Sequence, residues 1–165
     1  MISVAVITIS DSAAAGTRED VSGPAVAARA SEFGWQIAEK TIVRDDMGEI
    51  AAAIVGFADS GKVDLILSTG GTGLALRDVT PESVRSIADR EAPGFGEVMR
   101  AKGRTATPMA SLSRSGGYTR GATLIVTLPG SPRGAVESLE AVADLIPHAI
   151  NLLHGQTEHH AQPHS

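Results

Sequence analysis

The stretch LSTGGTGLALRDVTPE, residues 67–82, contains a glycine-rich turn between an apolar run and the expected start of a helix. The apolar residues VDLIL at positions 63–67 lead into it and favour a buried strand. Beyond the turn, Thr80 is typical of a helix N-cap and Pro81 of the first helical position. A strand, a turn with few side-chain atoms and a helix, in this order, indicate a crossover unit of an α/β fold.

Apolar runs of the same kind recur along the chain. Further strands are predicted at residues 2–9 (ISVAVITI) and 123–128 (TLIVTL), and a weaker run predicts one at residues 36–43 (QIAEKTIV). Because the strong runs are nearly continuous rather than alternating, we expect both faces of the sheet to be covered. Helical patterns lie between or after the strands, at residues 24–33, 49–58, 81–88 and 133–153, the last with a kink at Pro147.

Strands that alternate with helices predict one fold class. We expect a single three-layer, doubly wound α/β domain with a mostly parallel sheet and helices on both faces. A chain of 165 residues fits one domain with one substantial core. The domain is predicted to span residues 1–153, and the polar residues 154–165 are predicted to form a disordered tail.

Composition excludes several classes of function. A net charge of −5 and an aromatic content of 3% argue against a nucleic-acid partner. With no cysteine, disulfides, thiolate metal sites and cysteine nucleophiles are excluded. No apolar run approaches the ~20 residues that span a bilayer, and the N-terminus resembles a strand rather than a signal peptide. We therefore expect a cytoplasmic protein with no membrane partner.

Polar, glycine-rich segments follow each of the four predicted strands. In open α/β sheets, ligands bind outside the carboxyl ends of the strands. The segments are SDSAAAGTREDVSGP (10–24), RDD (44–46), the turn quoted above and PGSPRG (129–134). We expect these four segments to lie on one rim and to form the ligand site.

The glycine turn suits an anionic ligand. Gly70, Gly71 and Gly73 permit positive φ angles and a close approach of a ligand to the backbone. Successive amide groups in such a turn can hold an anion, and the hydroxyls of Thr69 and Thr72 add donors. The alternative is a tight strand-to-helix turn that binds nothing.

Asp78 follows this anion-binding turn closely. A carboxylate beside an anion repels it unless a cation intervenes, and Mg²⁺ is commonly held by one or two carboxylates together with substrate phosphates. Asp45 or Asp46, after the neighbouring strand, could supply a second carboxylate. Alternatively, Asp78 pairs with Arg77 or caps the next helix, and Asp45 and Asp46 form a solvated turn.

The remaining segments of the rim offer further donors. Ser10, Asp11, Ser12 and Asp20 could orient a polar ligand, or Ser10 and Asp11 could simply end the first strand. Arg18 could contact a phosphate or remain solvated. Ser131, after Pro129 and Gly130, is both a candidate helix cap and an anion donor. All five histidines lie beyond residue 147, so no Ser-His-Asp arrangement is indicated.

These motifs together resemble the MogA/MoaB family of molybdenum-cofactor biosynthesis, which includes the equivalent domain of gephyrin. TGGTG followed by RDVTPE carries the resemblance. The segments VITISDSAAAG, IVRDD, EAPGFGEVMR, LSR and LIVTLPGSPRG are similar to other landmarks of the family. The similarity runs from about residue 2 to residue 153.

The resemblance implies a homotrimer with molybdopterin adenylyltransferase activity. In that reaction, the molybdopterin phosphate attacks the α-phosphorus of ATP in the presence of Mg²⁺ and yields adenylated molybdopterin and pyrophosphate. The product then passes to a molybdenum insertase. Asp45 and Asp78 correspond to the family's two essential aspartates, as catalytic residues and metal ligands. The implied substrate-binding residues are Ser10, Asp11, Ser12, Thr69, Gly70, Gly71, Thr72, Gly73, Ser113, Pro129, Gly130 and Ser131.

The sequence departs from the family pattern at a few positions. Leu74 and Arg44 stand where prolines are usual, and the acidic pair is Asp45-Asp46 where Asp-Glu is frequent, so either aspartate could be the working carboxylate. The main alternative function is a non-catalytic, MoaB-like molybdopterin-binding protein, although such members tend to carry GDQAPE-like sequence instead of RDVTPE. A CinA-type nucleotide-cleaving or amidohydrolase activity and a gephyrin-like scaffold are further alternatives.

Overall fold

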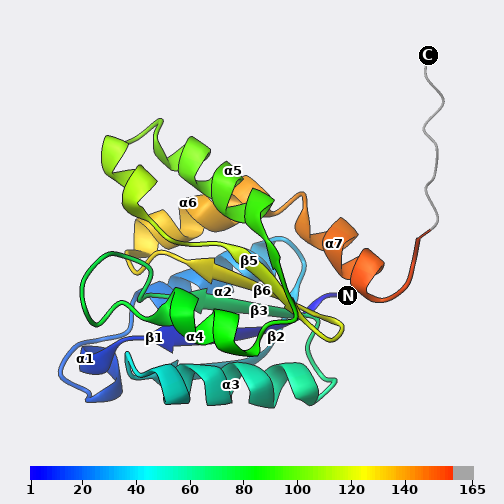
Figure 1. Cartoon of the computed structure of the whole chain (residues 1–165), viewed down its shortest axis with the longest axis horizontal. Helices are drawn as coiled ribbons and strands as arrows, with labels where there is room; N and C mark the ends of the chain where they lie inside the picture. The colour runs from blue at the N-terminus through cyan, green and yellow to red at the C-terminus, as the bar shows by residue number, and fades with distance from the viewer. Residues whose placement is uncertain (158–165) are drawn as a thin grey trace.

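The computed structural model describes residues 1–157. Their strands form one six-stranded sheet of order β2-β1-β3-β6-β5-β4 (Figure 1). The strands are β1 (Ser3–Ile9), β2 (Gln36–Val43), β3 (Leu65–Thr69), β4 (Arg90–Ala92), β5 (Gly117–Arg120) and β6 (Thr123–Leu128). The first four in spatial order are parallel, whereas β5 runs antiparallel to β6 and β4 antiparallel to β5. The predicted mostly parallel α/β sheet is confirmed.

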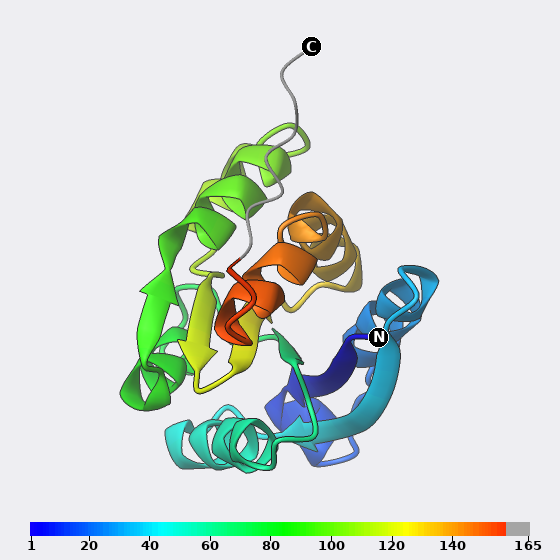
Figure 2. The same cartoon turned by 90° about the vertical axis from the view of Figure 1, so that its right-hand side faces the viewer.

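Helices cover both faces of this sheet. They are α1 (Asp11–Ala14), α2 (Ser22–Glu32), α3 (Met47–Asp59), α4 (Thr80–Ile87), α5 (Pro93–Gly103), the 3₁₀ helix η1 (Pro108–Leu112), α6 (Pro132–Val142) and α7 (Ile146–Leu153). One core cluster joins the sheet to α2, α5, α6 and α7, and a second joins it to α3 and α4. Figures 1 and 2 show α3 and the α6–α7 pair on opposite sides of the sheet.

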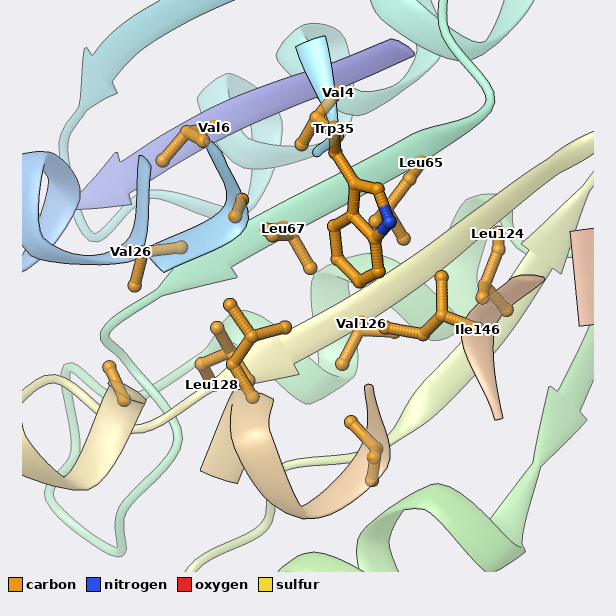
Figure 3. Close-up of a cluster of buried hydrophobic side chains, with 14 of the residues drawn as sticks. Val4, Val6, Val26, Trp35, Leu65, Leu67, Leu124, Val126, Leu128 and Ile146 are labelled. Carbon is orange, nitrogen blue, oxygen red and sulfur yellow. The ribbon is translucent and has the colours of Figure 1, made fainter. Parts of the chain in front are cut away.

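Each central strand supplies both core clusters. In β1, Val6 belongs to the cluster under α2 and α6, whereas Ile7 belongs to the cluster under α3. In β3, Leu67 and Ile66 divide in the same way. Figure 3 shows the first cluster, in which Trp35 lies over side chains from β3 and β6. Since each buried aliphatic side chain contributes roughly 1.5–3 kcal/mol, nearly continuous apolar strands are what a sheet covered on both faces requires.

The parallel register places the carboxyl ends of β1, β2, β3 and β6 on one edge. Ile9 pairs with Val43, and Thr69 pairs with both Thr8 and Leu128. The chain therefore leaves these four strands at nearly the same level. The predicted common rim is confirmed.

Two predicted helix details are wrong. The expected helix at residues 133–153 is two helices, α6 and α7, with a turn between them. Pro147 lies in the first turn of α7; because proline has no N–H and its ring clashes with a preceding helical turn, the helix breaks rather than kinks. Thr80 is the first residue of α4 and not its cap, and its hydroxyl donates to the Gly70 carbonyl at 2.9 Å.

The second half of the chain contains elements that were not predicted. These are β4, α5, η1 and β5, and the short α1 was also not predicted. The residues of β4 are mostly exposed, and α5 begins with the weak helix formers PGFG. At the C-terminus, backbone hydrogen bonds close α7 as far as Gln156. The rest of the predicted disordered tail, residues 158–165, lies outside the described residues. Among residues 1–157, no helix is both long and apolar enough to cross a membrane.

Candidate functional site

A polar cavity of about 240 Å³ lies at the carboxyl edge of the sheet. It is lined by the segments after β1, β2, β3 and β6, as the common rim predicts. Nine of the predicted site residues line this polar cavity, namely Ser10, Asp11, Ser12, Asp45, Thr69, Gly70, Gly71, Asp78 and Gly130. Residues that are up to 120 positions apart in sequence thus face one space.

Asp45 is fixed by a reciprocal pair of hydrogen bonds with Asp11. The Asp11 amide donates to Asp45 Oδ2 at 3.0 Å, and the Asp45 amide donates to Asp11 Oδ1 at 2.9 Å. Burial raises the pKa of the Asp45 carboxyl; the charges of Asp11 and Asp78 act in the same direction, while the Asp11 amide and Arg77 oppose it. A bound cation beside Asp45 would favour its ionised form.

The geometry separates the two aspartates of the acidic pair. Asp46 is exposed and caps α3, with its Oδ1 accepting from the Glu49 amide at 2.9 Å. Asp46 does not line the polar cavity, whereas Asp45 does. The pair is therefore more than a solvated turn, and Asp45 is the carboxylate available to a ligand.

Asp78 closes the loop that carries it. Its Oδ2 accepts from the Ala75 amide at 2.9 Å. Within residues 1–157, Asp78 makes no ion pair with Arg77 and does not cap α4, whose N-cap is Val79 without a side-chain bond. A Cβ atom on Gly73 would lie 2.8 Å from Asp78 Oδ2, so the glycine makes room for the carboxylate.

Internal packing requires the glycines of the turn at positions 70 and 71. Gly70 has a φ of +112°, and a Cβ there would lie 2.2 Å from the Ile9 carbonyl oxygen. Gly71 has a φ of +68°, and a Cβ there would lie 2.3 Å from Thr80 Oγ1 and 3.3 Å from Asp45 Oδ1. The bare backbone thus lets the turn sit against β1 and α4, and it leaves space beside Asp45.

The other predicted substrate-binding residues do not line the polar cavity. Ser113, Pro129 and Ser131 line a second cavity of about 280 Å³ among α5, η1 and α6. Ser131 caps α6, as predicted, by accepting from the Gly134 amide at 3.1 Å. Thr72 is buried. The carbonyl of Gly73 accepts from Arg114.

Thr69 and Pro129 connect the polar cavity to this second one. Thr69 is fully buried at the end of β3, and its hydroxyl donates to the Pro129 carbonyl at 2.7 Å. The predicted site is therefore split between two neighbouring cavities, which share the turn after β6.

Acidic side chains outnumber basic ones around the polar cavity. Its lining contains five carboxylates (Asp11, Glu19, Asp20, Asp45 and Asp78) and two guanidinium groups (Arg18 and Arg77). This excess would repel a phosphorylated ligand unless a cation entered with it. Residues 1–157 contain no cluster of three or more His, Asp or Glu side chains that could hold a metal ion. Two carboxylates completed by phosphate oxygens suit Mg²⁺, so the donor set fits that ion.

Further charged residues that line the polar cavity include Arg18 and Asp20, which the sequence offered as possible ligand contacts, and Arg77, which it did not. Asp20 has a structural task, since it accepts from the Thr8 hydroxyl at 2.8 Å and from the Gly23 amide at 3.0 Å. A useful signal for Arg77 is its position in a polar loop that follows a parallel strand.

A mostly parallel α/β sheet with a polar, glycine-rich cavity at its carboxyl edge defines the class of doubly wound α/β proteins, which bind their ligands at this edge. A family model described as "probable molybdopterin binding domain" matches residues 5–148. The chain belongs to this molybdopterin-binding family of molybdenum-cofactor biosynthesis proteins.

Individual relatives support this assignment. A protein of Helicobacter pylori strain J99 named molybdopterin adenylyltransferase is 39% identical over 156 residues, which cover 93% of this chain and 89% of the relative. A Synechococcus elongatus protein named molybdenum cofactor biosynthesis bifunctional protein is 41% identical, over 91% of this chain and 47% of its own length. The crystal structure of the molybdopterin biosynthesis enzyme MoaB from Thermus thermophilus has a TM-score of 0.88 and 45% identity, with 94% of this chain and 98% of that chain covered.

Proposed function

We propose that this protein is a molybdopterin adenylyltransferase that transfers AMP from ATP to the phosphate of molybdopterin. Similarity over almost the full length to a protein named for this activity supports the proposal. The observation that carries it is that Asp45 and Asp78, from the segments that follow two different strands, line one polar cavity together with the glycine turn.

The reaction suits a site without histidine or cysteine. A molybdopterin phosphate oxygen forms a bond to the α-phosphorus of ATP, and the bond from that phosphorus to the oxygen bridging to the β-phosphate breaks. Pyrophosphate leaves with the electron pair of the broken bond. The attacking phosphate is already an anion, so no general base is needed, and the protein contributes positioning and charge stabilisation.

The residues around the polar cavity divide these tasks. Asp45 and Asp78 would hold Mg²⁺, which when bound neutralises charge on the phosphates. The hydroxyls of Ser10 and Ser12 and the amide of Gly71 would bind phosphate oxygens. The guanidinium groups that line the cavity would offset the negative charge that these oxygens bring.

The second cavity offers a place for the ring system of one substrate. It contains the side chains of Met99 and Met109 beside Ser113 and Ser131. Thioether side chains adapt to flat aromatic rings. We assign the phosphates to the polar cavity and a ring of one substrate to the second cavity, on the far side of the turn after β6.

The same proposal includes the setting of the reaction. We propose a homotrimer in the cytoplasm that passes adenylated molybdopterin to a molybdenum insertase, as the sequence resemblance implies. The similarity to part of a protein named bifunctional supports a link between this step and another step of the same biosynthesis. Light scattering that gave the mass of a single chain would remove the trimer from the proposal.

One assay separates the enzyme from a binding protein. The similarity to a MoaB protein keeps the binding function as the second candidate. We would incubate the protein with molybdopterin, ATP and Mg²⁺ and follow adenylated molybdopterin by mass spectrometry and pyrophosphate by a coupled assay. We expect both products in equal amounts. Saturable molybdopterin binding with neither product would assign the protein to the binding class.

A further inference from the structure

Arg114 lies between η1 and β5 and reaches across to the segment that carries Asp78. Its Nε donates to the Gly73 carbonyl at 2.9 Å, and its Nη2 donates to the Asp78 carbonyl at 2.7 Å. Its Nη1 pairs with the Glu82 carboxylate in the first turn of α4. The Arg114 amide donates to the Thr72 carbonyl at 2.8 Å. One arginine therefore holds the segment at both of its ends.

The segment between Gly73 and Asp78, whose carbonyls accept from Arg114, packs few apolar side chains against the rest of the protein. We define residues 73–79 as the Asp78 loop, which projects at the left of Figure 1 between β3 and α4. Its residues 74–77 are exposed, and the side chain of Leu76 is fully exposed. A loop that buries few apolar groups depends on its hydrogen bonds for a fixed conformation.

We propose that Arg114 is a positioning residue that holds Asp78 in place at the polar cavity. Nothing in the reaction requires Arg114 to touch a substrate, and it does not line the polar cavity. Its effect on the reaction passes through the Asp78 loop. The catalytic part of this inference rests on the proposed function.

The geometry requires an arginine at this position. Two carbonyl acceptors in the Asp78 loop and the Glu82 carboxylate in α4 are met by three nitrogens of one planar guanidinium group. A lysine ammonium is a compact charge on a flexible chain and does not reproduce this fixed fork. Arg114 also holds the pKa of the Glu82 carboxyl below its usual range, so Glu82 stays ionised as its partner.

The chain contains a matched control for Arg114. Arg120, at the opposite end of β5, donates twice to the Asp59 carboxylate at 2.9 Å and once to the Ile87 carbonyl at 2.7 Å. The exposed fractions of the two arginine side chains are similar, 30% for Arg114 and 27% for Arg120. Arg120 lies at the edge of the sheet away from the polar cavity. Substituting either arginine by methionine removes three hydrogen bonds but keeps much of the aliphatic stem.

The first measurement is amide hydrogen exchange without ligands. In the wild-type protein, the Ala75 amide is bonded to Asp78 Oδ2, and the Asp78 amide to the Ala75 carbonyl. We expect faster exchange in the Asp78 loop for Arg114→Met, an intermediate rate for Arg114→Lys and wild-type exchange in this loop for Arg120→Met. Unchanged exchange in Arg114→Met would overturn the inference.

The second measurement is turnover of the folded variants. We expect kcat to fall roughly 10- to 100-fold in Arg114→Met, because a displacement of about 1 Å in a catalytic group can cost this much. Arg120→Met should keep the wild-type kcat although both variants unfold more easily. Wild-type kcat in Arg114→Met, or an equal loss in Arg120→Met, would overturn the inference. Absence of product from the wild-type protein would instead overturn the proposed function.

Discussion

Replacing Gly70 by alanine tests whether internal packing dictates the glycine turn. A Cβ at this position would lie 2.2 Å from the Ile9 carbonyl oxygen, 3.2 Å from the Ile9 carbonyl carbon and 3.6 Å from Ile9 Cβ. The first two are atoms of the β1 backbone, which cannot swing aside as the end of a flexible side chain can. The turn or the end of β1 would have to move.

The expected cost has two sources. A side chain at a φ of +112° costs about 1–3 kcal/mol in backbone strain. Relieving the overlap by shifting packed backbone costs about 1–3 kcal/mol more. Together, Gly70→Ala should lower the free energy of unfolding by about 2–6 kcal/mol, a large part of the total of about 5–15 kcal/mol for a typical domain.

Two other glycines isolate these sources. Gly61 has a φ of +69° with nothing within 4 Å of an added Cβ, so Gly61→Ala should cost about 1–2 kcal/mol from strain alone. Gly56 lies inside α3 with equally open space, and Gly56→Ala should stabilise the protein by about 0.5–1 kcal/mol. All three changes restrict the unfolded chain similarly, so their differences report on the folded state.

Denaturant unfolding at one protein concentration would measure the three variants. We expect the midpoints to rise for Gly56→Ala, to fall for Gly61→Ala and to fall furthest for Gly70→Ala. If Gly70→Ala cost no more than Gly61→Ala, the close approach of the turn to β1 would not explain the glycine at position 70.

Three further predictions concern the acidic side chains of the rim. Asp45 faces Asp11, Arg77 and Asp78, and the pKa of its carboxyl is raised in the folded state. In metal-free solution the folded state therefore binds the Asp45 proton more tightly than the unfolded state does. The stability that Asp45 contributes is then lost as the pH rises. Asp45→Asn should therefore be more stable than wild type at neutral pH, and the difference between the denaturant midpoints should shrink as the pH falls to about 4 and below; a difference independent of pH would contradict this. Asp46→Ala should lower the free energy of unfolding by about 1 kcal/mol through loss of the α3 cap, which thermal unfolding would measure. If the folded Asp46→Ala protein also turned over more slowly than the folded wild-type protein, Asp46 would be more than a helix cap. Chelation of divalent ions should abolish adenylated product and added Mg²⁺ should restore it, whereas full turnover in excess chelator would argue against a metal ion.

The sheet could be predicted from sequence because burial on both faces dictates its composition. The buried strands β1, β3 and β6 appear as apolar runs. The edge strand β2 is mostly exposed and has a weaker pattern, yet both β2 and β6 were predicted with their observed bounds. Parallel order then places their polar successors on one rim without further information. The antiparallel strands β4 and β5 are short and partly exposed, so their sequences carry no comparable pattern.

The role of each individual residue in the site could not be predicted in the same way. Asp45 and Asp46 are adjacent and chemically identical, and they differ only in what they face once α3 begins after them. The role of Gly70 depends on its distance from Ile9, more than 60 positions earlier in sequence. The Arg114 side chain has no local partner, since its acceptors lie 32 to 41 residues away along the chain.

The most direct test compares the rate of adenylated molybdopterin formation in Asp45→Asn, Asp78→Asn and Asp46→Asn at saturating Mg²⁺. Each change removes one negative charge and keeps the shape of the side chain. We predict that Asp45→Asn and Asp78→Asn lose roughly 100-fold or more in kcat, while Asp46→Asn keeps the wild-type rate once folded. Full turnover by Asp78→Asn, or loss of turnover by Asp46→Asn with Asp45→Asn unaffected, would contradict the assignment of the catalytic carboxylates to the polar cavity.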